Sequence, residues 1–191
     1  MLDFYDGGDM FDFVESKRGG LPDRDARFLF LQILDGLDFM HRNFICHRDM
    51  SLENIMLTKD LRAIIIDFGM ALRLPKDPTT GDEVRMPRMG ICGKKNYIAP
   101  EVLENTAPFF GHLVDIWAAG IILFILLTGL PPIDHASRNC PRYEMLCNGR
   151  LGEMLQQWNL YLDPEALDLI EKILQPQPKD RISIKEIRDH P

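Results

Sequence analysis

The spacing of apolar residues along the chain predicts several helices. In residues 26–41, apolar side chains return every three or four positions, as they do on the buried face of an amphipathic helix. Residues 116–127 are apolar on nearly every side, which is typical of a helix enclosed by other elements. Asp163, followed by a proline, begins a further helix over 164–174, and Ser183 begins a short last one. The pattern therefore favours one mainly helical domain.

Two apolar runs near the middle of the chain are too short for helices and predict a β-hairpin. They are residues 55–57 and 63–66, and the segment 58–62 between them has the length of a hairpin loop. If the two runs pair antiparallel, Asn54 faces the end of the second strand, where Asp67 follows directly. An amide oxygen and a carboxylate oxygen then meet at one end of the hairpin, which suits Mg²⁺.

A polar loop, residues 46–54, precedes this hairpin and holds the strongest candidate for acid–base chemistry. It places a histidine, an arginine, a carboxylate and an amide between two apolar segments. Asp49 of this loop lies one loop away from the expected metal ligands, where it can orient a hydroxyl group and take its proton. The alternative is a carboxylate that only caps a backbone turn.

Three motifs give the chain a resemblance to a known family. His-Arg-Asp-x-x-x-x-Asn spans residues 47–54, Asp-Phe-Gly occupies residues 67–69, and Ala-Pro-Glu occupies residues 99–101. In this order and at this spacing, the motifs resemble the signature of the eukaryotic protein kinases of the serine/threonine type. One motif alone would carry little weight, whereas three in order are specific.

The resemblance extends over nearly the whole chain and implies its architecture. Residues 7–11 resemble the segment just after the kinase hinge, and residues 115–120 resemble the buried helix that supports the catalytic loop. Arg181 matches the arginine that pairs with Glu101. The fold implied is mainly α: the carboxy-terminal lobe (C-lobe) of a kinase, a helical bundle around a buried central helix, with a small β-hairpin carrying the catalytic loop.

The same alignment leads us to expect that the amino-terminal lobe is missing. Leu2 falls near the gatekeeper position, so residues 1–191 would form a partial kinase domain of hinge and large lobe, with residues 67–101 as its activation segment. The sequence holds no GxGxxG, and Lys17 is the only lysine before Asp49. A kinase holds ATP with a glycine-rich loop and a strand lysine, so we expect these residues by themselves to bind ATP weakly.

The resemblance implies an ATP-dependent serine/threonine protein kinase, which transfers a phosphoryl group from Mg-ATP to a protein hydroxyl. Asp49 matches the catalytic base, Asn54 and Asp67 match the Mg²⁺ ligands, and His47 matches a packed structural histidine. Residues 96–101 are closer to the serine/threonine group than to the tyrosine group. The positions assigned to nucleotide binding are Asp9, Glu53, Asn54, Met56 and Asp67.

Two departures from the family pattern concern the cation near the phosphate. Serine/threonine kinases usually carry a lysine two residues after the catalytic aspartate, where this chain has Ser51, and a threonine where it has Lys94. We count both positions among the catalytic residues and expect Lys94 to reach into the space left at Ser51. The positive charge would then come from position 94 instead of position 51. The alternative is two independent losses, with Lys94 and Lys95 merely solvated.

Regulation by phosphorylation is not favoured by the sequence. In kinases the residue matching Arg48 often pairs with a phosphorylated threonine of the activation segment, but Gly90 and Ile91 occupy that place here. Thr79 or Thr80 of the same segment is the alternative site, although threonines beside a proline are common on protein surfaces. We therefore expect no switch of this kind at residues 90 and 91.

Two acidic positions bear on the substrate. Asp9 and Glu53 match carboxylates that, in related kinases, contact ribose or basic residues upstream of the target serine. A preference for arginine-containing peptides is one hypothesis, and ordinary solvated carboxylates are the other.

Composition narrows the partners and the compartment. A net charge of -7 argues against general binding to nucleic acids or anionic membranes. The first residues lack the basic start and apolar stretch of a signal peptide, and the four cysteines lack the spacing of a zinc site or disulfide framework. We expect a cytoplasmic or nuclear protein whose partners are ATP and a protein substrate. The competing hypothesis is a non-catalytic, pseudokinase-like lobe that serves as a scaffold.

Overall fold

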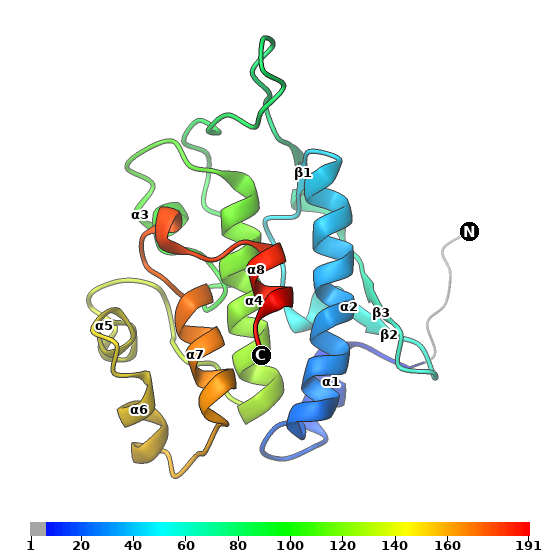
Figure 1. Cartoon of the computed structure of the whole chain (residues 1–191), viewed down its shortest axis with the longest axis vertical. Helices are drawn as coiled ribbons and strands as arrows, with labels where there is room; N and C mark the ends of the chain where they lie inside the picture. The colour runs from blue at the N-terminus through cyan, green and yellow to red at the C-terminus, as the bar shows by residue number, and fades with distance from the viewer. Residues whose placement is uncertain (1–6) are drawn as a thin grey trace.

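The structure, a computed structural model, describes residues 7–191, and these are mainly helical (Figure 1). Leu2, the expected gatekeeper position, lies outside the described residues. The strands form two separate antiparallel pairs, β1 with β4 and β2 with β3. The helices are α1 (Met10–Glu15), α2 (Asp23–Arg42), α3 (Pro100–Glu104), α4 (Gly111–Thr128), α5 (Pro141–Cys147), α6 (Leu151–Gln157), α7 (Pro164–Ile173) and α8 (Ile184–Asp189). The strands are β1 (Ile45–Cys46), β2 (Ile55–Leu57), β3 (Ala63–Ile65) and β4 (Leu72–Arg73), and short 3-10 turns cover Leu52–Asn54, Phe68–Met70 and Pro178–Asp180.

Helix α4 is the centre of the core, as its uniformly apolar sequence predicts. It stands between α2 and α7 in Figure 1 and contacts both of them. Trp117, Ile121 and Phe124 on this helix are fully buried. Gly120 lets α7 approach closely, because a Cβ atom at this position would lie 2.6 Å from Ile173 Cγ2. The central helix expected from the sequence is therefore present.

The observed α4 is longer than the apolar run that predicts it. It has 18 residues, and in the described part of the chain it is the one helix long and apolar enough to cross a membrane. Within this structure 83% of that stretch is buried. The packing of α2 and α7 against it accounts for its apolar surface as that of a core helix.

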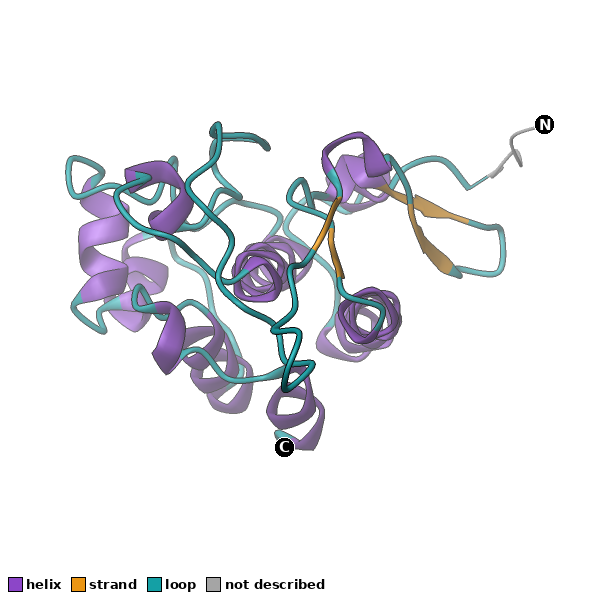
Figure 2. Ribbon diagram, turned by 90° about the horizontal axis from the view of Figure 1, so that it is seen from above, coloured by secondary structure: helices purple, strands orange, loops and turns teal. Residues whose placement is uncertain are grey.

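The predicted hairpin is confirmed, and helix α2 fixes its position. Strands β2 and β3 pair antiparallel, with Ile55 opposite Ile65. Gln32 of α2 accepts a hydrogen bond from the Ala63 backbone N–H at 3.0 Å and donates one to the Leu61 carbonyl at 3.1 Å. In Figure 2 the β2–β3 hairpin lies toward one edge of the molecule, whereas the β1–β4 pair lies nearer the middle, where β1 contacts both α2 and α4.

Several elements go beyond what the sequence pattern predicts. Residues 134–150 show no helical period in the sequence, yet α5 begins at Pro141, a residue that favours the first helical position. Helices α5 and α6 have seven residues each, which is too short to produce a clear period. Strand β4 has two residues and pairs with β1, far away in the sequence. A long-range pairing therefore forms β4, whereas α5 and α6 are simply too short to be recognised from a period.

Candidate active site

The polar loop, residues 46–54, is held by one buried carboxylate from α4. Asp115 is fully buried and accepts hydrogen bonds from the backbone N–H groups of His47 and Arg48, each at 2.8 Å. His41 of α2 places its Nε2 atom 3.0 Å from the same carboxylate. Arg48 has φ +69°, a left-handed conformation that costs free energy for a residue with a side chain. The two hydrogen bonds to Asp115 stabilise this strained turn and fix the residues that follow.

Asp49 follows the strained turn with its two carboxylate oxygens in different settings. Asn54 Nδ2 donates to the Asp49 carbonyl at 2.7 Å and to Asp49 Oδ2 at 3.1 Å. Asp49 Oδ1 is buried and has no hydrogen-bond partner among residues 7–191. An unpaired buried carboxylate oxygen is costly, so its presence marks a position where a proton donor can bind.

Asn54 and Asp67 meet at the end of the hairpin, as the pairing of β2 with β3 predicts. The Ile66 backbone N–H donates to the Asn54 carbonyl at 2.9 Å, and Asp67 follows at once. Asp67 has φ +59°, and its Oδ1 atom accepts a hydrogen bond from Gly69 at 3.1 Å. Asn54 Oδ1 and Asp67 Oδ2 accept no hydrogen bond within the described chain. Two such oxygens fit Mg²⁺, which usually takes one or two protein ligands together with phosphate and water.

His47 is a packed structural residue, as the sequence predicts. Its side chain is fully buried, and Nε2 lies 2.9 Å from the Ile66 carbonyl. Its ring packs against Phe68, with the ring centroids 5.3 Å apart. These contacts join the polar loop to the end of β3, so His47 supports the site through packing.

Ser51 and Lys94 are brought together by the fold. Ser51 is fully buried, and Lys94 Nζ donates a hydrogen bond to its Oγ atom at 2.8 Å. The same ammonium lies 3.9 Å from Glu53 Oε1. Lys95 is exposed and makes no hydrogen bond or ion pair to any described residue. Neighbouring lysines in the sequence therefore occupy different environments.

The residues expected to contact nucleotide fall into two places. Asp9 and Met56 form an isolated β-bridge, and the Leu57 backbone N–H donates to the Gly8 carbonyl at 2.9 Å. The Asp9 carboxylate also accepts a hydrogen bond from Asp12 at the start of α1, at 2.8 Å. Glu53 instead lies beside Lys94, and its Oε2 atom is buried without a hydrogen-bond partner in the described residues.

Arg48 extends from the polar loop toward the segment 67–101. Its guanidinium donates to two backbone carbonyls, those of Met70 at 3.5 Å and Gly90 at 3.3 Å. Thr79 and Thr80 lie in an exposed turn, where their backbone N–H groups donate to the Asp77 carboxylate. The contacts given for Arg48 thus involve the main chain of the segment and neither threonine.

A second anchor for the segment 67–101 was not predicted from the sequence. Glu83 pairs with Nδ1 of His112 and accepts a hydrogen bond from the Gly111 backbone N–H at 3.2 Å, both at the start of α4. The rings of His112 and His41 are in edge contact, with centroids 6.0 Å apart. This pairing could not be predicted from the sequence, because Glu83 and His112 belong to no motif and only the fold brings them together.

The expected pairing of Glu101 with Arg181 is confirmed. Arg181 Nη1 and Nη2 donate to the two carboxylate oxygens of Glu101, each at 2.7 Å. The guanidinium is fully buried, lies over the Trp117 ring at 5.0 Å from its centroid, and also donates to the Leu113 carbonyl. This pair fastens the end of the segment 67–101 to the helical core.

Tyr97 lies between this anchor and Lys94. Burial, and then the nearby Glu53 carboxylate, raise the pKa of the Tyr97 phenol well above its ordinary value. A hydrogen bond with the Leu52 backbone lowers that pKa in part. The Tyr97 phenol is therefore neutral at physiological pH and serves to pack the segment against the polar loop.

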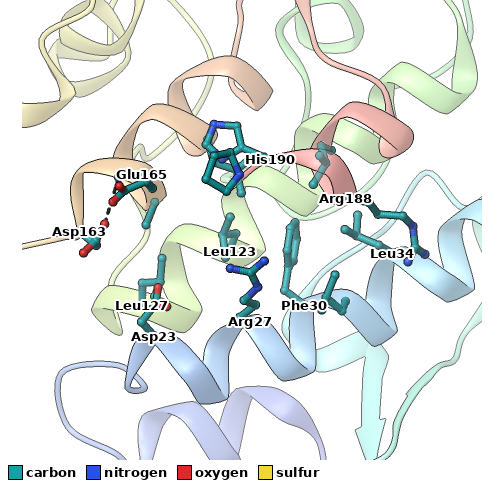
Figure 3. A pocket seen from close by; sticks show the side chains of 15 residues that line it. Asp23, Arg27, Phe30, Leu34, Leu123, Leu127, Asp163, Glu165, Arg188 and His190 are labelled. Atoms are coloured by element: carbon teal, nitrogen blue, oxygen red, sulfur yellow. Dashed lines mark hydrogen bonds between the residues drawn. The ribbon is translucent and has the colours of Figure 1, made fainter.

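A hollow of ≈ 310 Å³ lies elsewhere, among α2, α4, α7 and α8 (Figure 3). The side chains of Arg27, Phe30 and Leu123 line it, together with His190 near the end of the chain. None of the candidate catalytic residues lines this hollow. A much smaller space, of ≈ 10 Å³, adjoins Asp49 and Lys94.

Comparisons with known proteins agree on one family. The family model described as the protein kinase domain matches residues 1–191. A probable serine/threonine-protein kinase of Dictyostelium discoideum is 38% identical over 100% of this chain and 21% of its own length. CBL-interacting protein kinase 1 of Oryza sativa subsp. japonica is 36% identical over 100% of the chain and 38% of its own length. The phosphorylase b kinase gamma catalytic chain, liver/testis isoform, of Bos taurus is 33% identical over 100% of the chain and 45% of its own length. The chain thus spans less than half of the length of each of these curated relatives.

Proposed function

The chain belongs to the protein kinase family, and from this premise we propose that it carries the catalytic loop of a serine/threonine protein kinase that transfers a phosphoryl group from Mg-ATP to a protein hydroxyl. Residues 1–191 then correspond to the hinge and large lobe of the kinase domain, with residues 67–101 as the activation segment. The relatives named as serine/threonine-protein kinases support the reaction class.

The observation that carries this proposal is the setting of Asp49. One carboxylate oxygen is held by Asn54 Nδ2 at 3.1 Å, while the other is buried and has no partner in the described residues. Asp49 Oδ1 orients the substrate hydroxyl and takes its proton. Asn54 and Asp67 would hold Mg²⁺, which when bound neutralises charge on the phosphates. Asp115 keeps the loop in its strained conformation throughout.

A non-catalytic scaffold is the competing function, and one observation favours it. Ser51 stands where serine/threonine kinases usually carry a lysine, so the polar loop itself lacks that cation. The two functions differ in what they require of Asp49, Asn54 and Asp67. A scaffold has no physical need for a free carboxylate oxygen beside two metal ligands.

The proposal is tested by replacing Asp49 in the full-length protein as it occurs in the cell, including any sequence that flanks these residues. We expect Asp49→Asn to lower phosphoryl transfer from radiolabelled ATP to a peptide panel by about 100-fold or more, since general-base catalysis contributes 10²–10⁴-fold. Asp60→Asn is the matched control, because Asp60 is exposed on the hairpin loop. Equal activity of the two variants would show that Asp49 is not the catalytic base. An intact protein that transfers no phosphate would leave the scaffold function.

A further inference from the structure

Ser51 and Lys94 form a contact that the proposed function leaves unexplained. Ser51 is fully buried two residues after the candidate base, and Lys94 Nζ lies 2.8 Å from its Oγ atom. Lys94 comes from the segment 67–101 and lies 43 residues after Ser51 in the sequence. A lysine from one segment thus occupies space within another, next to Asp49.

The backbone on both sides of Lys94 is fixed against the polar loop. Gly93 has φ +96°, and a Cβ atom there would lie 3.1 Å from the Arg48 carbonyl and 3.5 Å from Asp49 Oδ1. A glycine is therefore required both by its conformation and by its close approach to the loop. The Tyr97 backbone N–H donates to the Lys94 carbonyl at 2.8 Å and closes a turn. Lys94 is consequently held beside the base by its main chain.

The charges around Asp49 give Lys94 a specific task. Phosphoryl transfer needs positive groups at the transferring phosphate. The Arg48 guanidinium is already engaged, because it donates hydrogen bonds to the Met70 and Gly90 carbonyls. Lys94 has three N–H donors, and one of them reaches the neutral Ser51 hydroxyl. Glu53 Oε1 at 3.9 Å is too far for a hydrogen bond, so donors remain for a phosphate.

We propose that Lys94 is a catalytic residue that contacts the transferring phosphoryl group, with Ser51 as the positioning residue that orients its ammonium. This proposal rests on the proposed kinase function. Lys94 makes and breaks no covalent bond. The substrate hydroxyl oxygen bonds to phosphorus, the bond from phosphorus to the departing ADP oxygen breaks, and Asp49 takes the hydroxyl proton. Lys94 stabilises the negative charge on the phosphoryl oxygens during this exchange.

The first experiment measures steady-state kinetics of the intact protein with Mg-ATP and a peptide substrate. We expect Lys94→Thr to lower kcat by about 100-fold, as loss of one charge-stabilising donor does, with a much smaller change in the KM of the peptide. Lys95→Thr is the matched control and should change kcat by less than about twofold, because Lys95 is exposed and without a partner in the described residues.

A double variant separates a catalytic cation from a structural contact. Ser51→Lys combined with Lys94→Thr supplies the cation from the polar loop while removing it from the segment 67–101. We expect this variant to recover kcat by about tenfold over Lys94→Thr alone. A purely structural role for the Lys94 contact predicts no recovery, since the original contact is lost in both variants.

The second readout does not depend on activity. Acetylation of lysines by an amine-reactive ester, followed by mass spectrometry, is compared with and without Mg²⁺ and a non-hydrolysable ATP analogue. We expect the nucleotide to slow acetylation of Lys94 several-fold and to leave Lys95 unchanged. If the intact protein is active but Lys94→Thr behaves as Lys95→Thr does, this proposal fails and the kinase function stands. If the protein neither transfers phosphate nor shows slower acetylation of Lys94 with the nucleotide, the kinase function and the role of Lys94 both fail.

Discussion

At the scale of single residues, the side chains of the site are positioned by one hydrogen bond and keep another polar group available for a ligand. Asn54 holds one oxygen of Asp49 and leaves the second unpaired. Lys94 is held by Ser51, and Glu53 lies near it at 3.9 Å. Both side chains of this ion pair are about one third exposed, 36% for Lys94 and 35% for Glu53. Water therefore screens their attraction, and a charged substrate group can compete for Glu53.

This competition predicts a change in peptide preference. Glu53 is a candidate site for a basic residue upstream of the phosphorylated serine, and Lys94 partly neutralises it. We expect Lys94→Thr to raise the ratio of rates for peptides with and without upstream arginine by about threefold to fivefold, the worth of one exposed ion pair. A positional peptide library measures this ratio, which is independent of the overall rate.

The matched variant is Glu53→Gln, which should abolish any preference for arginine in the same library. A ratio that is identical in the wild type, Lys94→Thr and Glu53→Gln would show that Glu53 contacts no basic substrate residue.

At the scale of elements, helix α4 organises the molecule through both of its faces. Asp115 near its start fixes the polar loop, and Gly120, five residues further on, lets the end of α7 pack against it. A helix buried on all sides leaves little space for added atoms, because protein interiors are as dense as organic crystals. The packing around α4 should therefore be sensitive to the smallest substitutions.

Two glycines in helices provide a direct test of this packing. In Gly120→Ala the new Cβ atom would lie 2.6 Å from Ile173 Cγ2 and 2.8 Å from Leu174 Cδ2. We expect the free energy of unfolding to fall by about 2 kcal/mol, as overpacking does. In Gly152→Ala the nearest atom lies 3.6 Å away, an ordinary contact. That variant should gain up to about 1 kcal/mol from helix propensity.

Urea unfolding followed by the fluorescence of the buried Trp117 measures both changes. Opposite signs for the two glycine variants are expected, and equal signs would contradict the close approach of α7 to α4.

Elements with a long or strongly marked pattern were predictable from the sequence. These are α2, α4, α7, α8 and the β2–β3 hairpin, whose signals are a sustained period, a capping residue or a turn of fixed length. Helices α5 and α6 were not, because they are too short to show a period, and strand β4 was not, because it is short and pairs with a strand distant in sequence. Within the site, the motif residues and the approach of Lys94 to Ser51 could be anticipated. The anchor formed by Glu83 and His112 could not, since it depends on the tertiary fold alone.

At the scale of the whole molecule, the segment 67–101 is fastened to the helical core near its middle and at its carboxy-terminal end. Glu83 joins it to the start of α4, and Glu101 joins it to Arg181. The Arg181 guanidinium is fully buried, so removing its partner leaves a charge without compensation in the interior. This pair connects parts of the chain that are 80 residues apart.

The buried pair should therefore contribute far more to stability than the ion pairs on the surface. We expect Glu101→Gln to lower the free energy of unfolding by about 3–5 kcal/mol, the usual effect of breaking a buried pair. Glu153→Gln is the control, because Glu153 pairs with Arg150 where both side chains are at least 50% exposed. Its effect should be far smaller, because solvent screens an exposed ion pair. Urea unfolding of both variants under one set of conditions decides between these values.

The contact of Arg48 with the Gly90 carbonyl has a consequence for how this protein can evolve. Every residue type has a backbone carbonyl, so replacement of the Gly90 side chain leaves the contact available. Gly90 has an ordinary backbone conformation, and a Cβ atom there would meet nothing within 4 Å. Substitutions of Gly90 should therefore cost little stability. A serine or threonine at this position would stand next to the Arg48 guanidinium. A phosphoryl group on such a hydroxyl would carry negative charge and hydrogen-bond acceptors to the guanidinium of Arg48.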